Sequence, residues 1–132
     1  MGSYFSRYNK FTKKIKDKKI RKLFKKFTYE ESKTWDYRVY NLLNKMIEPN
    51  YDINSIESGH LRIFIIQEPA CWLLLIRNES FLNYIELTWS SMVENIYNCE
   101  KDKENDDIVT SEFKEVFYLI NNIHGDRFKI FN

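Results

Sequence analysis

The chain has 132 residues and a formal net charge of +2, and 43% of its residues are hydrophobic, 17% aromatic and 30% charged. This length and composition predict one folded domain and exclude a chain that is disordered throughout. They also exclude an integral membrane protein, because the longest apolar run, residues 70–76, is far shorter than the ~20 residues of a membrane-spanning helix.

The charge is divided unevenly along the chain. Residues 1–28 contain eleven lysines and arginines and one acid, whereas residues 29–132 contain ten basic and eighteen acidic residues. The small total therefore conceals a net +10 followed by a net −8. We expect a single domain, 1–132, in which a basic segment (1–28) and an acidic body (29–132) attract opposite partners.

The basic segment is predicted to be helical and amphipathic. Its apolar residues recur at spacings of three and four from Phe5 to Phe27, but their phase shifts between Ile15 and Ile20. This pattern predicts either two short helices with a break near Asp17 or one helix whose apolar stripe drifts. The polar side would carry a basic patch formed by Lys13, Lys14, Lys18, Lys19, Lys22, Lys25 and Lys26.

The next helix is predicted to begin at a capping box, residues 28–31, and to end before Pro49. Its apolar residues, Trp35 among them, fall on one side of the helical wheel, and Tyr37 stands on the opposite side. We therefore expect Tyr37 to be an exposed aromatic residue and a candidate partner contact.

Two apolar runs, residues 60–66 and 70–77, follow a polar connection and are separated by residues 67–69. Runs of this length between turn residues predict a β-hairpin. Neither run alternates cleanly between apolar and polar residues, so both faces of the hairpin are expected to be covered, at least partly, by helices. Periodicity alone leaves a buried helix open as an alternative for residues 71–76.

The longest predicted helix runs from Phe81 to about Asn98, with Asn78 or Ser80 as its cap. Leu87 lies in the middle of its polar side, where a leucine is out of place on a solvated surface. An acidic stretch follows this helix. The partner-binding surface is therefore predicted to contain Tyr37, Tyr84, Leu87, Glu94, Asp102, Glu104, Asp106 and Asp107.

A last helix is predicted from Thr110 or Ser111 to a left-handed cap at Gly125, and a short strand is predicted for residues 127–131. Together these elements predict an α+β fold. It is a helix-rich single domain in which a central β-hairpin, with this third short strand beside it, packs between helices.

No motif for catalysis, a cofactor or a metal accompanies these elements. His60 and His124 are far apart in sequence and lack the spacing of zinc ligands, so we expect no catalytic residues, no cofactor and no metal site. A two-histidine nuclease site would require the fold to bring them together. Cys71 is expected to be buried, and the absence of a signal-peptide pattern favours a reducing, cytoplasmic setting.

The expected function is non-enzymatic protein binding. The acids between residues 94 and 107 suit a basic active-site cleft, because complementary charge steers association and buried aromatic anchors hold a complex together. In size, single-domain organisation and composition, the chain resembles the immunity proteins of contact-dependent inhibition and polymorphic toxin systems. This resemblance implies an inhibitor that covers the active site or substrate-binding surface of a basic, nuclease-type toxin domain.

Two alternatives use the basic segment instead. Gly2, followed by Ser6 and Arg7, fits an N-myristoylation pattern that, with the lysines, would recruit the chain to a membrane surface. Nucleic-acid binding through residues 7–27, with stacking on Tyr8 or Phe11, is the second alternative. The acidic body and the lack of a known nucleic-acid-binding motif argue against it.

Overall fold

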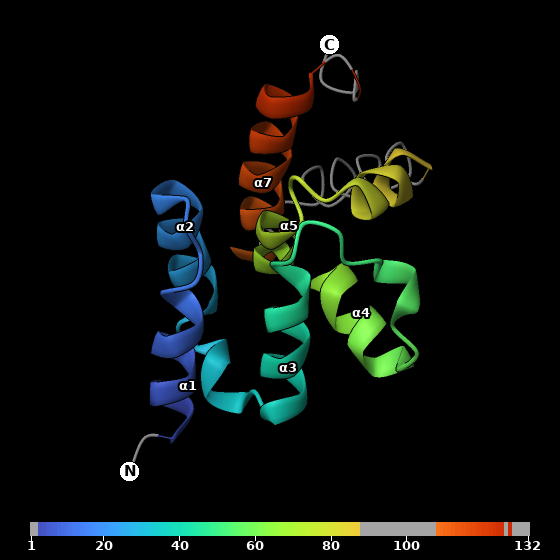
Figure 1. Cartoon of the computed structure of the whole chain (residues 1–132). Helices are drawn as coiled ribbons and strands as arrows, with labels where there is room; N and C mark the ends of the chain where they lie inside the picture. Colours follow the sequence, from blue (N-terminus) through green and yellow to red (C-terminus); the bar gives the residue numbers. More distant parts are fainter. Residues whose placement is uncertain (1–2, 88–107, 126, 128–132) are drawn as a thin grey trace.

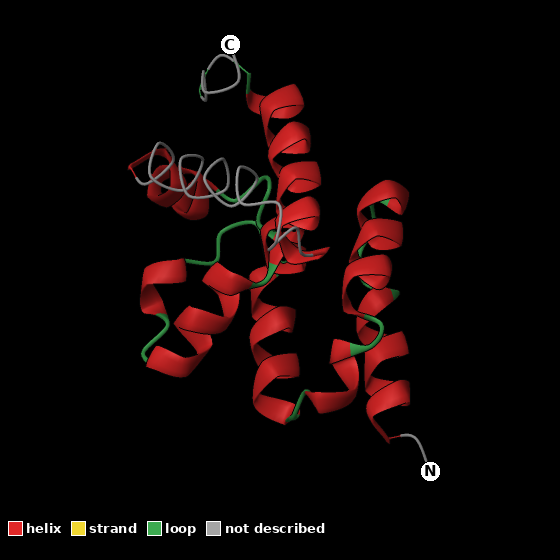
Figure 2. Cartoon of the chain, turned by 180° about the vertical axis from the view of Figure 1, so that it is seen from behind, coloured by secondary structure: helices red, strands yellow, loops and turns green. Residues whose placement is uncertain are grey.

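The computed structural model describes residues 3–87, 108–125 and 127, and every regular element in these residues is a helix (Figures 1 and 2). The predicted α+β class is therefore wrong, since the described part of the chain contains no strand. The elements are α1 (Ser3–Thr12), α2 (Lys18–Thr28), η1 (Glu31–Thr34), α3 (Tyr37–Met46), η2 (Ile53–Ser55), α4 (Gly59–Gln67), α5 (Pro69–Leu74) and α7 (Ile108–His124). A further helix begins at residue 79 and continues to residue 87, where the first described stretch ends.

The predicted hairpin is replaced by two helices, α4 and α5. Ser58 Oγ accepts a hydrogen bond from the Leu61 backbone N–H and caps α4, and Pro69 occupies the first position of α5, where its missing N–H costs nothing. The short connection at residues 67–69, predicted as the turn of the hairpin, therefore links two consecutive helices. The indole N–H of Trp72 donates to the Ile65 carbonyl oxygen at 3.1 Å and ties α5 to α4.

The basic segment forms two helices, as the first of the two sequence interpretations predicts. The break falls at Asp17, whose carboxylate accepts hydrogen bonds from the backbone N–H groups of Lys19 and Ile20 and caps α2. The predicted capping box at residues 28–31 is wrong. Thr28 is the last residue of α2, with its hydroxyl donating to the Phe24 carbonyl oxygen, and Asp36 caps α3 instead.

The short helix α5 lies at the centre of the described core and contacts α2, α4 and α7. Trp72 on α5 is buried, with ring centroids 5.2–5.5 Å from those of Phe81, Phe113 and Phe117. A second aromatic cluster joins the N-terminal helices to α3 and α4. It consists of Tyr8, Phe11, Phe24, Trp35, Tyr40 and Phe64. The predicted burial of Cys71 is confirmed, and Trp35 and Trp72 are buried as well.

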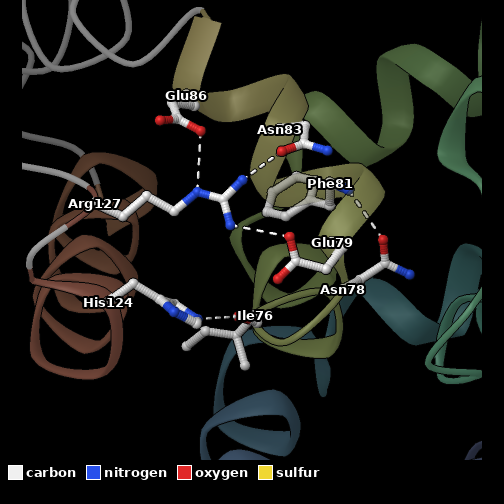
Figure 3. A network of polar contacts seen from close by, with 8 residues as sticks. All are labelled: Ile76, Asn78, Glu79, Phe81, Asn83, Glu86, His124 and Arg127. Carbon is white, nitrogen blue, oxygen red and sulfur yellow. Dashed lines mark hydrogen bonds and ion pairs between the residues drawn. The ribbon is translucent and has the colours of Figure 1, made fainter.

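The end of α7 is fastened to the helix of residues 79–87 (Figure 3). Arg127 donates to Glu79 and Glu86 at 3.0 Å each and to the side-chain oxygen of Asn83. His124 Nε2 lies 2.8 Å from the Ile76 carbonyl oxygen. These contacts connect the C-terminal end of α7 to residues 76–86. Of the predicted terminal strand, only Arg127 lies in the described part, and it stands in a turn.

Of two predicted helix caps, the one at Asn78 is confirmed and the one at Gly125 is not. Asn78, one of the two predicted caps, accepts the Phe81 backbone N–H at 3.0 Å on its side-chain oxygen. Gly125 does follow the last helix, but without the left-handed φ that the sequence predicts. A Cβ atom at Gly125 would lie 2.8 Å from the Asn121 carbonyl oxygen, so glycine is required by close approach to backbone.

Candidate docking site

An apolar hollow of about 300 Å³ opens between η2, α4 and the helix of residues 79–87. Buried aromatic rings of Trp72 and Phe81 form part of its lining, and the half-buried ring of Tyr84 forms another part. The remaining described lining residues are Ile53, Asn54, Ile56, Arg62, Ile65 and Ile66. The hollow is thus apolar at its centre and carries few polar groups.

The helix α4 departs from the usual pattern of a surface helix. Its apolar residues occupy every side, yet Ile65 is the only residue of α4 that is fully buried. Ile63 is 53% exposed and Ile66, one turn further along, is 39% exposed. A helix that is apolar all round is normally enclosed by the protein core. This part of the surface is therefore more apolar than its own fold requires.

The frame around the hollow is held by side-chain hydrogen bonds. Ser80 Oγ donates to the Asp52 carboxylate at 2.9 Å and accepts the Ile53 backbone N–H at 3.2 Å, which joins η2 to the helix of residues 79–87. Arg62 Nε donates to the Ile56 carbonyl oxygen and holds α4 against the segment that precedes it. These hydrogen bonds fix the walls of the hollow relative to one another.

Three of the predicted partner contacts lie in the described part of the chain. Tyr84 lines the hollow, and Leu87, one turn beyond it on the same helix, is 89% exposed. Tyr37 is 61% exposed at the start of α3, as expected, but it does not line this hollow. The acidic members of the predicted surface, Glu94, Asp102, Glu104, Asp106 and Asp107, lie outside the described residues.

The predicted basic patch is exposed on the opposite side of the molecule. In both views α1 and α2 lie on one side of α3 and α5, and α4 lies on the other (Figures 1 and 2). Every one of its seven lysines is exposed: Lys13, Lys14, Lys18, Lys19, Lys22, Lys25 and Lys26. Lys26, 3.8 Å from Glu115, is the one lysine of this patch with an ion pair among the described residues, so the acids that the structure describes leave the other six without one.

Three carboxyl groups gather where η1 and the first turns of α5 and α7 approach one another. Burial, together with a hydrogen bond to Glu31 and repulsion by it, raises the pKa of Glu68 to about 9. Burial and repulsion by Glu31 raise the pKa of Glu112 to about 7. Glu68, only 7% exposed, therefore keeps its proton at neutral pH. Lys26 acts in the opposite direction and lowers the pKa of Glu112.

The structure does not bring together the two histidines that a nuclease site would require. His60 is exposed at the start of α4, whereas His124 is bonded at the end of α7, well above α4 in both views. Cys71 is fully buried, and burial raises the pKa of its thiol, which suppresses its reactivity. Within the described ranges no group of three or more histidines, cysteines and acids is arranged to hold a metal ion.

Several residues of the docking site are missed by the sequence prediction. Because residues 60–66 are interpreted as a strand, Ile63 and Ile66 are predicted to lie on opposite faces of a hairpin that helices cover at least partly. The sequence gives no indication of a role for Arg62. A helical wheel drawn over residues 59–67 would have signalled the anomaly, since it leaves no polar side of useful width. The cap at Ser58 and the proline at the start of α5 are the signals that favour this alternative.

Comparison with protein-family models, curated proteins and solved structures yields no significant match, so the assignment of function depends on the geometry. None of the helices that the structure describes combines the length and the apolar character needed to cross a bilayer.

Proposed function

We propose that this chain is a non-enzymatic protein-binding domain whose docking surface is the hollow between α4 and the helix of residues 79–87. The observation that carries the proposal is the exposure of apolar residues on both helices beside the hollow. Ile63 lies one turn before Ile66, which lines the hollow, and Leu87 lies one turn after Tyr84, which also lines it. An apolar patch with polar surroundings is typical of a protein-interaction surface.

The shape of this surface favours a protein partner over a small ligand. A hollow of about 300 Å³ is at the lower limit for a drug-sized molecule. It can accept one or two apolar side chains, and the exposed residues around it would then be covered by the body of the partner. A central anchor in a pocket with a surrounding ring that excludes water is the arrangement of an interface hot spot.

Within this function, an inhibitor or immunity protein for a basic toxin domain is the specific form that we favour. Its support comes from the sequence, where six acids and two lysines occur between Glu94 and Asp107 in the chain segment that follows Leu87. Acids of this density attract a cationic surface and accelerate encounter, while the apolar hollow would supply the lasting contact.

Recruitment to a membrane by the basic segment receives less support from the geometry. Apart from the half-buried Leu23, the large apolar residues described between residues 8 and 27 are buried in the core, Phe11, Phe24 and Phe27 among them, so α1 and α2 have no broad apolar side left to insert into a bilayer. Gly2, the acceptor of the predicted acylation, lies outside the described residues. Only electrostatic attraction would remain for this alternative.

The proposal is tested by capture of the partner from the native host with wild-type chain and with surface variants as bait. Ile63→Asp and Leu87→Asp should each abolish capture of a protein that wild type retains, because a carboxylate would be desolvated in the interface. Tyr118→Asp, which alters an equally exposed residue on α7, should leave capture unchanged. The captured protein is then purified and its affinity for the three variants is measured directly.

The inhibitor form has a separate readout. Neutralising Asp102, Glu104, Asp106 and Asp107 should slow association at low salt and have little effect on the dissociation rate. The docking proposal is refuted if the Ile63 and Leu87 variants bind as wild type does. The inhibitor form alone is refuted if the partner has no basic surface or keeps its activity in the complex.

A further inference from the structure

A second, chemically different hollow of about 380 Å³ lies between α1 and α3, on the other side of the molecule from α4 (Figure 1). Its described lining is polar and basic and contains no acid. The lining residues are Arg7, Lys10, Phe11, Lys14, Tyr37, Tyr40, Asn41 and Asn44. We call this hollow the α1–α3 cleft.

One wall of the α1–α3 cleft is a row of cations. Arg7 and Lys10, three positions apart, share one face of α1, and Lys14 follows in the turn just after the helix ends at Thr12. All three are exposed, and neither Arg7 nor Lys10 makes a side-chain hydrogen bond or ion pair in the part of the chain that the structure describes. Lys14 Nζ donates to the side-chain oxygen of Asn44 at 2.8 Å, which directs it across the cleft.

The opposite wall supplies an aromatic face and amides. Tyr37 is 61% exposed and is the first residue of α3. The neighbouring Asp36 carboxylate, which would repel an anion, is bound by Arg38 at 2.8 Å and by two backbone N–H groups. The side-chain NH₂ of Asn44 donates to the Tyr40 carbonyl oxygen, so the orientation of this amide is fixed.

The row of cations continues beyond the cleft. Lys14 also lines a neighbouring hollow of about 640 Å³, which contains Lys13, Lys16 and Arg77 together with two acids, Asp17 and Glu48. Arg7 and Lys10 are about 4.5 Å apart along α1, at 1.5 Å per helical residue, and Lys14 extends the row past the end of the helix. Cations in such a row can contact successive phosphates of a single strand.

We propose that the α1–α3 cleft binds single-stranded nucleic acid, with phosphates along Arg7, Lys10 and Lys14 and a base stacked on Tyr37. Cations that follow a backbone and an exposed ring on which a base stacks are the two elements of single-strand recognition. The stacking residues expected from the sequence, Tyr8 and Phe11, are buried in the core. Tyr37 provides the accessible ring instead.

The geometry separates this ligand from other anions. A bilayer surface is too flat to reach a cleft wall, and the described apolar residues of α1 are buried in the core. A duplex presents its phosphates but encloses its bases, so it cannot use Tyr37. The remaining lysines of α2 are exposed, and they would attract any polyanion without selecting among them.

The test is fluorescence anisotropy with a labelled oligouridine of about twelve nucleotides, against a duplex of equal length, uridine monophosphate and phosphatidylserine vesicles. Arg7→Ala/Lys10→Ala should weaken oligouridine binding about tenfold at low salt and flatten the log–log salt slope by ~1.4, since each contact contributes ~0.7 for a single strand. Lys22→Ala/Lys25→Ala removes the same charge from α2, outside the cleft, and should weaken binding about threefold or less.

The aromatic contact is tested independently of charge. Tyr37→Ala should weaken oligouridine binding about tenfold, Tyr37→Phe should retain it, and Tyr118→Ala, at an equally exposed tyrosine on α7, should have no effect. Binding of the duplex should be unaffected by Tyr37→Ala.

The proposal is overturned by any of four results. These are no oligouridine binding up to about 100 µM, the range of non-specific binding; equal losses for the cleft pair and the α2 pair; no effect of Tyr37→Ala; or binding confined to the mononucleotide or the vesicles. The protein-docking face is on the other side of the molecule, so these results do not bear on it.

Discussion

The two sides of the molecule use apolar residues in opposite ways. On the side of α1 and α2, the large apolar residues described from Tyr8 to Phe27 are buried, apart from the half-buried Leu23, and the lysines face outward. On the side of α4, Ile63, Ile66 and Leu87 remain in contact with solvent. The first side follows the ordinary rule for amphipathic helices. The second side breaks it, and this break is the basis of the docking proposal.

This difference also distinguishes two kinds of binding. A cationic surface attracts many polyanions and loses them as salt increases, because the gain is mainly counterion release. An apolar hollow with a fixed frame is insensitive to salt and depends on shape. Variants can therefore be chosen that destabilise the core shared by both sides, that alter the junction between the two sides, or that affect one side alone.

The largest effect is expected from Trp72→Ala, which should destabilise the core on which both sides depend. Trp72 is buried on α5 and also lines the apolar hollow, so its truncation leaves a large cavity at the centre of the core. We expect the free energy of unfolding to fall by about 3–5 kcal/mol. Urea denaturation followed by far-UV circular dichroism measures this loss. Full stability in the variant would contradict the central role of α5.

The next effect is a pH dependence at the junction of the two sides, where Glu68 joins α4 to α5. Its pKa is about 9 in the folded chain and 4.5 ordinarily, so the unfolded chain releases this proton first. The contribution of protonated Glu68 to stability is therefore complete at acid pH and declines as the pH rises from about 4.5 to about 9. One such proton contributes a slope of up to about 1.4 kcal/mol per pH unit.

Glu68→Gln should flatten this decline and stabilise the chain at pH 8, because the amide stays neutral. Urea unfolding at a series of pH values measures the slope. Glu30→Gln, at an exposed carboxylate paired with Lys33, serves as the control and should leave the slope unchanged. An identical slope in the Glu68 variant would show that this carboxyl is ionised in the folded chain.

A smaller effect is expected from Tyr8→Phe, which acts on the basic side alone. The Tyr8 hydroxyl and Thr28 Oγ1 are 2.7 Å apart in a buried hydrogen bond that joins α1 to α2. Thr28 still donates to Phe24 in the variant, so no buried donor is left unpaired, and the loss should be about 1 kcal/mol. Thermal unfolding measures it, with Tyr29→Phe at an exposed ring as the neutral control.

The smallest effect on stability is expected from Ile63→Ser and Leu87→Ser on the apolar side. Both side chains are more than half exposed, so each substitution should change the free energy of unfolding by about 0.5 kcal/mol or less. A larger destabilisation would mean that these residues belong to the core. Self-association at high concentration, measured by sedimentation, should decrease in both variants because exposed apolar area is removed.

The sequence predicts the N-terminal half of the fold better than the remainder. The phase shift between Ile15 and Ile20 indicates the break at Asp17, and the helical periodicity correctly buries Trp35. The prediction for residues 60–77 is wrong because the periodicity of a short apolar run does not distinguish a strand from a helix. Their helical state is decided by the cap at Ser58, by Pro69 and by contacts of α5 with three other helices.

The candidate sites show the same division. Exposure of Tyr37, of Leu87 and of the seven lysines follows from local pattern alone and is confirmed. The grouping of Tyr37 with Arg7 and Lys10 does not follow from local pattern, because it depends on how α1 packs against α3. The high pKa of Glu68 likewise depends on its burial in the fold and on the approach of Glu31, thirty-seven positions earlier in the chain.

The position of α5 between α2, α4 and α7 has a consequence for how the chain can be divided. A fragment that carries only the N-terminal helices would lack α5, against which α2 packs. We therefore expect that neither the N-terminal nor the C-terminal half folds as an isolated peptide. The chain should melt as one cooperative unit, and a ligand that engages one flank should protect amides on the distant flank from exchange.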